Sequence, residues 1–174
     1  MQRAQKGDRP ACAALVEQYW DKLYHWLYHL CHDCHAAEDL TQETFLKAFA
    51  SLKSFRAGTN LHAWLFRIAH NSFLNQRRAG RKARQAFPAD VITTAEGPAE
   101  EAMSREALQL LARAVGRLPT DYRAAFLLRV EENLSFRDMA DVLQTSEENA
   151  RWRVYKARQK LMEVLAPQLD KGKS

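Results

Sequence analysis

Residues 37–78 of the chain, AEDLTQETFLKAFASLKSFRAGTNLHAWLFRIAHNSFLNQRR, decide the fold. Apolar residues recur every three or four positions on both sides of the loop SFRAGT, which predicts one helix from about Ala36 to Leu52 and another from about Asn60 to Arg84. Asn60 is a suitable N-cap because its side-chain oxygen can accept hydrogen bonds from the first backbone amides. No stretch alternates with the period of a strand, so the sequence predicts helices throughout.

The same periodicity continues in both directions along the chain. A helix is predicted from about Pro10 to Leu30. Proline, glycine and small polar residues in FPADVITTAEGPAEE indicate a linker, and helices are predicted after it at about 100–117, 120–132, 136–143 and 146–165. The predicted fold is therefore all-α, with two small helical domains at residues 1–86 and 104–174 joined by a flexible acidic linker at residues 87–103.

The charge is unevenly distributed along the chain. Residues 1–86 hold 13 basic and 7 acidic residues (+6), residues 87–106 hold 1 and 5 (−4), and residues 107–174 hold 12 and 9 (+3). Two basic blocks on either side of an acidic connector favour a polyanionic partner such as nucleic acid.

Motifs of catalysis, export and membrane insertion are missing from the sequence. There is no glycine-rich phosphate loop, G-x-S-x-G or H-E-x-x-H, so we do not expect an enzyme. No apolar run reaches the ~20 residues that cross a bilayer, and the N-terminus MQRAQKGDRP has no apolar core of a signal peptide. We therefore expect a cytoplasmic protein without membrane insertion.

Two predicted helices carry faces suited to nucleic acid. In the helix that begins near Asn60, helical spacing places amide, aromatic and guanidinium side chains on one side, a mixture that suits unpaired bases and phosphate: Asn60, Trp64, Arg67, Asn71, Leu74 and Arg78. The last two predicted helices have the spacing of a helix-turn-helix. Ser135 with Asp138 resembles a capping box that begins the first of them, and Ser146 is expected to cap the second. The apolar seam predicted between these two helices consists of Phe136, Met139, Ala140, Leu143, Ala150, Val154, Ala157 and Leu161. The exposed side predicted for the last helix can enter a major groove, and its residues are Asn149, Arg151, Trp152, Arg153 and Lys156.

The quoted segment resembles region 2 of the extracytoplasmic-function (ECF) subgroup of bacterial σ70-family sigma factors. The pieces that carry the likeness are A-E-D-x-x-Q-[ED]-x-F-[LI] and W-L-[FY]-x-I-A-x-N. Leu118-Pro119, Tyr122-Arg123-x-x-Phe126 and Tyr155-Lys156-Ala157-Arg158-x-x-Leu161 resemble region 4 of the same subgroup. The likeness runs from about Gly7 to Leu165 and includes the spacing of the two domains.

The resemblance implies an initiation factor that binds core RNA polymerase and promoter DNA and is regulated by an anti-sigma factor. It implies that Asp39, Gln42 and Glu43 contact the β′ clamp helices of the polymerase. The residues expected to bind the −10 element are Arg56, Asn60, Trp64, Arg67, Asn71, Arg77, Arg78 and Arg81. The residues expected to bind the −35 element are Asn149, Arg151, Trp152, Arg153 and Lys156.

Two other functions stay open from the sequence. A sigma-like mimic could occupy an anti-sigma factor without directing transcription, an alternative favoured by Glu147, Glu148 and Trp152, which depart from the family pattern at the start of the recognition helix. A free-standing helix-turn-helix repressor is disfavoured because the first domain would then have no task.

Residues 31–35, CHDCH, match the haem c attachment pattern C-x-x-C-H. Haem c attachment normally needs export, which the N-terminus does not indicate. Thiolate and imidazole ligands also suit Zn²⁺ or Cu⁺, and the candidates are Cys31, Cys34 and His35, with His29 and His32 nearby. The segment joins two helices whose own apolar stripes can pack them, so we expect an ordinary connection and no cofactor.

Overall fold

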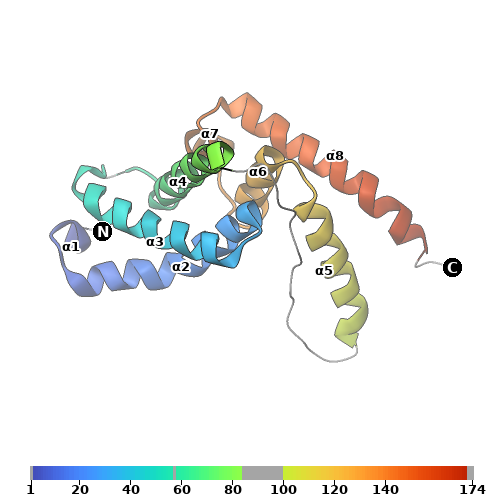
Figure 1. Cartoon of the computed structure of the whole chain (residues 1–174), viewed down its shortest axis with the longest axis horizontal. Coiled ribbons are helices and arrows are strands. Elements are labelled where there is room, and N and C mark those ends of the chain that lie inside the picture. Colours follow the sequence, from blue (N-terminus) through green and yellow to red (C-terminus); the bar gives the residue numbers. More distant parts are fainter. Residues whose placement is uncertain (1, 57, 84–99, 172–174) are drawn as a thin grey trace.

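The computed structural model describes residues 2–56, 58–83 and 100–171, without the side chains of residues 2, 81–83, 100–107 and 167–171. Every regular element in these ranges is a helix (Figure 1). The helices are α1 (Gln2–Gln5), α2 (Arg9–Cys31), α3 (Cys34–Ser51), the 3₁₀ helix η1 (Leu52–Ser54), α4 (Leu61–Ala83), α5 (Glu100–Gly116), α6 (Thr120–Val130), α7 (Phe136–Leu143) and α8 (Glu147–Lys171). The all-α prediction is confirmed, while α1 and η1 were not predicted and α8 continues past Leu165.

The CHDCH segment forms the reversal between α2 and α3. His32 ends α2 in a left-handed conformation with φ 55°, and its N–H donates to the carbonyl oxygen of Tyr28 at 2.8 Å. Asp33 begins α3, because its carboxylate accepts a hydrogen bond from the N–H of Ala36 at 3.0 Å. The segment therefore closes one helix and caps the next, and it allows α2 and α3 to pack side by side.

The first domain is completed by α4, which packs on α3. Asn60 caps α4 as predicted: its Oδ1 accepts from the backbone N–H groups of His62 at 3.1 Å and Ala63 at 3.4 Å. Gly58 precedes it at φ 89°, a conformation that glycine adopts without strain. Phe66 is fully buried and meets the edge of the Trp26 ring, with 5.3 Å between the ring centroids.

The second domain contains the predicted helix-turn-helix. Ser135 caps α7 by accepting from the N–H of Asp138, and Ser146 caps α8 by accepting from the N–H of Asn149, each at 3.1 Å. Between them, Gln144 turns the chain at φ 51°. The predicted apolar seam is largely buried, and α5, α6 and α7 all pack on α8; its buried members are Met139, Leu143, Ala150, Val154, Ala157 and Leu161.

The two domains pack against each other, which the sequence did not predict. Helix α7 lies along α4, and α6 lies against α2, so the buried residues of both domains form one core (Figure 1). The indole of Trp26 is fully buried at this junction, and its Nε1 donates to the carbonyl oxygen of Ala124 on α6 at 3.5 Å. We call the α4–α7 and α2–α6 contacts the interdomain seam.

The predicted linker falls mostly outside the described residues, since residues 84–99 are not described. Helix α5 begins at Glu100, so the last residues of the predicted linker are helical. The domain limits 1–86, 87–103 and 104–174 stay a prediction. None of the described helices combines the length and the apolar character needed to cross a membrane.

Replacing Trp26 by alanine should strongly destabilise the protein. The side chain is 0% exposed, so its removal leaves a cavity and should lower the free energy of unfolding by about 3–5 kcal/mol. Trp152 is 47% exposed, so Trp152→Ala is the matched control and should cost less than about 1 kcal/mol. Denaturant unfolding measures both, and equal losses would contradict the burial of Trp26.

Candidate nucleic-acid interface

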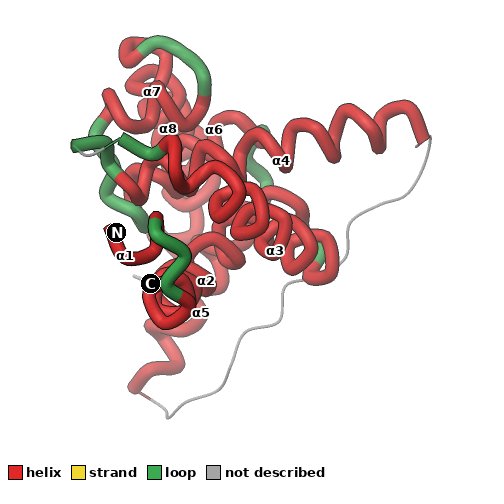
Figure 2. Tube along the Cα trace, turned by 90° about the vertical axis from the view of Figure 1, so that its left-hand side faces the viewer, coloured by secondary structure: helices red, strands yellow, loops and turns green. Residues whose placement is uncertain are grey.

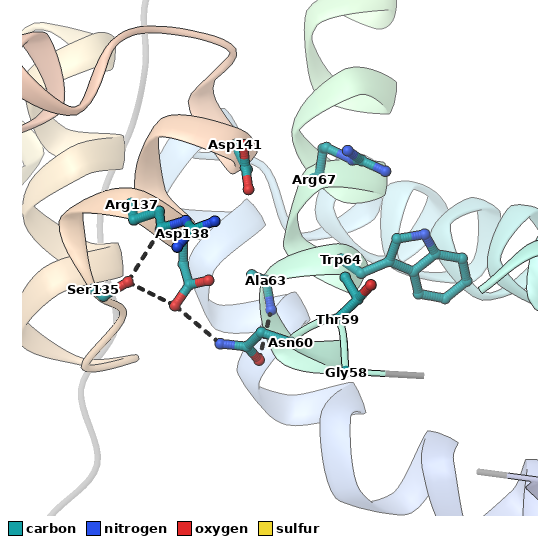
Figure 3. Close-up of a pocket in the computed structure, with 10 residues that line it drawn as sticks. All are labelled: Gly58, Thr59, Asn60, Ala63, Trp64, Arg67, Ser135, Arg137, Asp138 and Asp141. Atoms are coloured by element: carbon teal, nitrogen blue, oxygen red, sulfur yellow. Dashed lines mark hydrogen bonds between the residues drawn. The ribbon is translucent and has the colours of Figure 1, made fainter. Parts of the chain in front are cut away.

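Three of the residues predicted to bind the −10 element lie on the side of α4 that faces α7. The amide nitrogen of Asn60 donates to the Asp138 carboxylate at 3.1 Å, and the amide oxygen of Asn71 accepts from Gln144 Nε2 at 2.7 Å. Arg67 is exposed and lines, with Asn60 and Asp138, a cavity of ≈ 520 Å³ between the domains (Figure 3). Asn60 and Asn71 are therefore already engaged by hydrogen bonds from the second domain.

The remaining −10 candidates are placed differently. Arg56 is exposed in the loop before α4, whereas Trp64 is only 8% exposed and meets Phe55 edge-to-face with ring centroids 5.1 Å apart. Trp64 is thus a core side chain beneath the loop and not an open stacking surface. Arg77 and Arg78 are exposed on the C-terminal half of α4, which projects beyond the other helices (Figure 2). The side chain of Arg81 lies outside the described residues.

The residues predicted to bind polymerase lie together on α3. Asp39 and Gln42 are exposed, and the half-buried Glu43 pairs with Lys47, which also donates to Ser72 Oγ on α4 at 3.0 Å. Leu46 follows on the same face and is 71% exposed, the largest exposure among the large apolar residues described. Leu46 was not predicted as a site residue, although its spacing of three and four residues from Glu43 and Gln42 places it on their face of the helix.

The predicted −35 face of α8 is partly engaged within the second domain. Arg151 contacts Glu147 at 3.2 Å and lies over the Phe136 ring at 4.5 Å, and Trp152 meets Tyr122 edge-to-face at 5.6 Å. Lys156 is half-buried and donates to Gln159 Oε1 at 3.1 Å.

The other two residues of this α8 face are half-buried. Asn149 lies in the first turn of α8, and Arg153 lies one turn further along. Arg153 is close enough to His70 on α4 for its charge to lower the pKa of that imidazole. The predicted face is therefore partly turned toward the first domain.

Histidines of the first domain lie along the interdomain seam. His62 Nε2 is 2.9 Å from the Glu132 carboxylate, and both side chains are largely buried. His70 is 6% exposed, and its Nδ1 has no hydrogen-bond partner within the described residues. The pKa of His70 is lowered to about 4, chiefly by burial; Asp121 and the backbone of Val142 oppose this shift, and the charge of Arg153 adds to it.

The CHDCH segment reaches the seam through His32. The guanidinium of Arg123 on α6 donates to His32 Nε2, and both burial and this cation lower the pKa of His32. Burial raises the pKa of the Cys31 thiol to about 12, whereas Cys34 and His35 are exposed on α3. Within the described residues, no three His, Cys, Asp or Glu side chains gather in a group that could hold a metal ion.

Comparisons with known proteins match both domains. The family models Sigma-70 region 2 and Sigma-70, region 4 match residues 15–83 and 108–161. The RNA polymerase sigma-H factor of Pseudomonas aeruginosa is 33% identical over 97% of this chain and 93% of its own length. The ECF RNA polymerase sigma-E factor of Haemophilus influenzae is 32% identical over 96% of this chain and 94% of its own. The chain belongs to the ECF sigma factors of the σ70 family.

Solved sigma factors share the fold over both domains. The sigma factor RpoE of Bartonella quintana, solved with the anti-sigma factor NepR, has a TM-score of 0.73 at 29% identity over 88% of this chain and 96% of that one. CnrH, solved with the cytosolic domain of CnrY, has a TM-score of 0.70 at 25% identity over 95% and 94%.

As an ECF sigma factor, the protein binds core RNA polymerase and directs promoter-specific initiation of transcription. Region 2 comprises α2, α3 and α4, and region 4 runs from α5 into α8. The relatives are sigma factors, a class whose members are in general not enzymes.

None of the contacts between region 2 and region 4 was predicted from the sequence. Asp138 was predicted as part of a helix cap, and the cap is confirmed, but its carboxylate also binds Asn60, 78 residues earlier. Nothing in the sequence indicated that Gln144 and Glu132 contact the first domain, because a polar residue in a turn or at a helix end is ordinarily solvated. Such long-range pairs leave no periodic pattern in a single sequence.

The pKa of His70 predicts that the fold weakens in acid. The unfolded chain takes up a proton near pH 6.5, whereas folded His70 does so only near 4, so this stabilisation is complete above pH 6.5 and is lost as pH falls toward 4. The difference corresponds to at most about 3 kcal/mol. Urea unfolding at pH 7.5 and pH 5 should show the loss, and His70→Gln, which cannot take up a proton, should lose less; equal losses would contradict the shift.

The cysteines should differ sharply in reactivity. Iodoacetamide at pH 8 should modify exposed Cys34 first and Cys31 last, because the raised pKa leaves Cys31 almost no thiolate. Cys12, also half-buried, is the internal control for accessibility. A mass-spectrometric time course measures the three rates, and modification of Cys31 as fast as Cys34 would show that the thiol is not shielded.

Proposed function

We propose that α3 is the polymerase-binding element of this sigma factor. Asp39 and Gln42 are exposed on one face with Glu43, and Leu46 adds an exposed apolar side chain beside them. An acidic and polar surface around one apolar anchor is a common composition for a protein interface. This accessible cluster on α3 is the observation that carries the proposal.

Helix α4 and the loop before it would then read the −10 element. We assign base recognition to Asn60, Arg67 and Asn71, because amide and guanidinium groups can satisfy the edges of unpaired bases. Phosphate contacts are assigned to Arg56, Arg77, Arg78 and Arg81, with Trp64 supporting the loop from below.

The −35 element would be read by the exposed part of α8. Asn149, Arg151, Arg153 and Lys156 supply donors for bases and phosphates, and Trp152 supplies apolar contact. Glu147 and Glu148 lie in the first turn of α8, where their negative charges interact favourably with the helix dipole. The same charges repel DNA phosphates that approach this end of the helix. We therefore expect region 4 to bind DNA weakly when it acts alone. When α4 and α8 are both tethered to one polymerase, the effective concentration of each DNA-binding helix rises, and this compensates for weak individual binding.

The protein would act in the cytoplasm, without enzymatic activity or cofactor. An anti-sigma factor is its expected regulator, since the solved sigma factors it resembles are held in complexes with anti-sigma factors. Run-off transcription with purified core polymerase on a promoter-fragment library tests the function. Specific transcripts support it; core polymerase that binds the protein yet makes no specific transcript would favour the sigma-like mimic.

Charge reversal on α3 tests the polymerase interface. Asp39→Arg with Glu43→Arg should weaken binding to core polymerase by about tenfold or more, because opposed charges at an interface are costly. Glu17→Arg with Asp21→Arg is the control: these acids are also exposed and four residues apart, but they lie on α2. Fluorescence anisotropy gives the affinities and circular dichroism verifies the helices. An equal loss in both variants would refute the assignment to α3.

A further inference from the structure

Histidines of region 2 face region 4 at three places along the interdomain seam. His32, in the turn before α3, meets α6 through Arg123. His62 and His70, on α4, meet Glu132 after α6 and the packed group of α6, α7 and α8. Imidazole changes its charge closer to neutral pH than any other side chain at its ordinary pKa. The closed arrangement of the two regions is therefore held at several points by groups whose charge depends on pH.

His32 holds its part of the seam only as a neutral imidazole. Its Nε2 accepts a hydrogen bond from Arg123, and a ring nitrogen that accepts carries no proton of its own. His29 lies near the same guanidinium, and burial first and the charge of Arg123 second lower the pKa of both imidazoles. Negative charge does not offset them: burial raises the pKa of the Cys31 thiol to about 12, and the Asp33 carboxylate caps α3. Protonation of His32 therefore breaks its contact with Arg123 and sets two cations against each other.

His70 has no acceptor in place for a second N–H. The ring is 6% exposed and lies beside the Trp26 ring, with 6.1 Å between the centroids, and its Nδ1 has no hydrogen-bond partner within the described residues. Among these residues, the charged groups that face it are Asp121 on α6 and Arg153 on α8, while α7 contributes a backbone hydrogen bond from Val142. All three belong to region 4. A proton on Nδ1 is thus costly while region 4 covers the ring and becomes favourable in acid once water replaces region 4.

The contact of His62 responds to acid in the opposite direction. Its Nε2 is 2.9 Å from the Glu132 carboxylate, so protonation of the ring turns this contact into an ion pair. Tyr19, whose ring lies 5.6 Å from the imidazole, keeps its proton, because burial raises its pKa. Both partners of the ion pair are largely buried, and desolvation offsets much of their attraction. The two contacts that acid weakens, those of His32 and His70, therefore determine the direction of the response.

We propose that the interdomain seam is an acid-sensitive switch: protonation of His32 and His70 separates region 4 from region 2 while both regions stay folded. The apolar contacts between α2 and α3 and between α7 and α8 lie within one region each, so a charge at the seam does not reach them. The inference goes beyond the proposed function, since the response needs neither polymerase nor DNA nor an anti-sigma factor.

The direction and range of the response follow from proton linkage. In the closed arrangement His70 takes up a proton only near pH 4, whereas an imidazole in water does so near 6.5. The closed state is therefore fully favoured above pH 6.5 and loses this advantage as the pH falls toward 4. At pH 5, His70 alone should shift the equilibrium toward the open state by up to about thirtyfold relative to pH 7.5.

The test uses full-length wild type and the double variant His32→Gln with His70→Gln. The glutamine oxygen can accept from Arg123 as the imidazole does, and the amide takes up no proton in this pH range. His35→Gln is the matched control, because it makes the same change at an exposed histidine on α3. Small-angle X-ray scattering gives the radius of gyration in a series from pH 7.5 to pH 4.5, and circular dichroism of the same samples gives the helicity.

We expect the radius of gyration of wild type and of His35→Gln to rise as the pH falls, at constant helicity, and that of the double variant to stay at its value for pH 7.5. An unchanged radius in wild type would overturn the proposal, and so would an equal rise in the double variant. A rise that coincides with loss of helicity would also overturn it, because acid would then unfold the regions and not separate them. Should the double variant not match the wild-type radius at pH 7.5, the two single variants give the same test, because each should move the rise to lower pH.

Discussion

The buried guanidinium of Arg123 is the constraint around which the two domains meet. The residue is 5% exposed, and a buried guanidinium is costly unless acceptors face its donors. Its Nε has no hydrogen-bond partner within the described residues, so the contacts of Nη1 are the ones that hold the group. Its Nη1 donates to the carbonyl oxygen of Gly116 at 3.0 Å and also to Nε2 of His32. The end of α5, the start of α6 and the turn after α2 therefore have to converge at one point. The neutral imidazole of His32, favoured by its lowered pKa, is the acceptor that this geometry requires.

The helix caps and the apolar faces of the helices were predictable from the sequence, because each depends on residues only a few positions apart. The caps at Asn60, Ser135 and Ser146 and the apolar stripes of the long helices act over a few residues, and all three caps form as predicted. The seam joins residues 70 to 98 positions apart, from His62 with Glu132 to Trp26 with Ala124, so no periodicity reveals it. The candidate site was predictable as faces of helices, whereas the burial of Trp64 beneath Phe55 depends on the loop, which is set by tertiary contacts.

The CHDCH segment shows how a letter pattern and a physical role can diverge. His32 and Asp33 act as a helix end and a helix start, roles that need a left-handed backbone and a short carboxylate and nothing from a metal. Cys31 is shielded enough to hold its thiol proton, and His32 is used by Arg123. His32 and Asp33 thus form the turn between α2 and α3, and His32 also binds Arg123 in the interdomain seam.

The contacts inside region 2 and the polar contacts between α4 and α7 differ in how deeply they are buried. Within region 2, Leu23, Leu27 and Leu40 are at most 1% exposed, and each such side chain contributes about 2 kcal/mol by leaving water. Across the α4–α7 contact, the hydrogen bonds of Asn60 and Asn71 are exposed, and each is worth about 1 kcal/mol. Water or another polar partner can replace exposed hydrogen bonds of this kind at little net cost, whereas nothing in solution replaces the burial of the leucines inside region 2. The polar part of the α4–α7 contact therefore contributes the smaller share of the stability, and the apolar core contributes the larger.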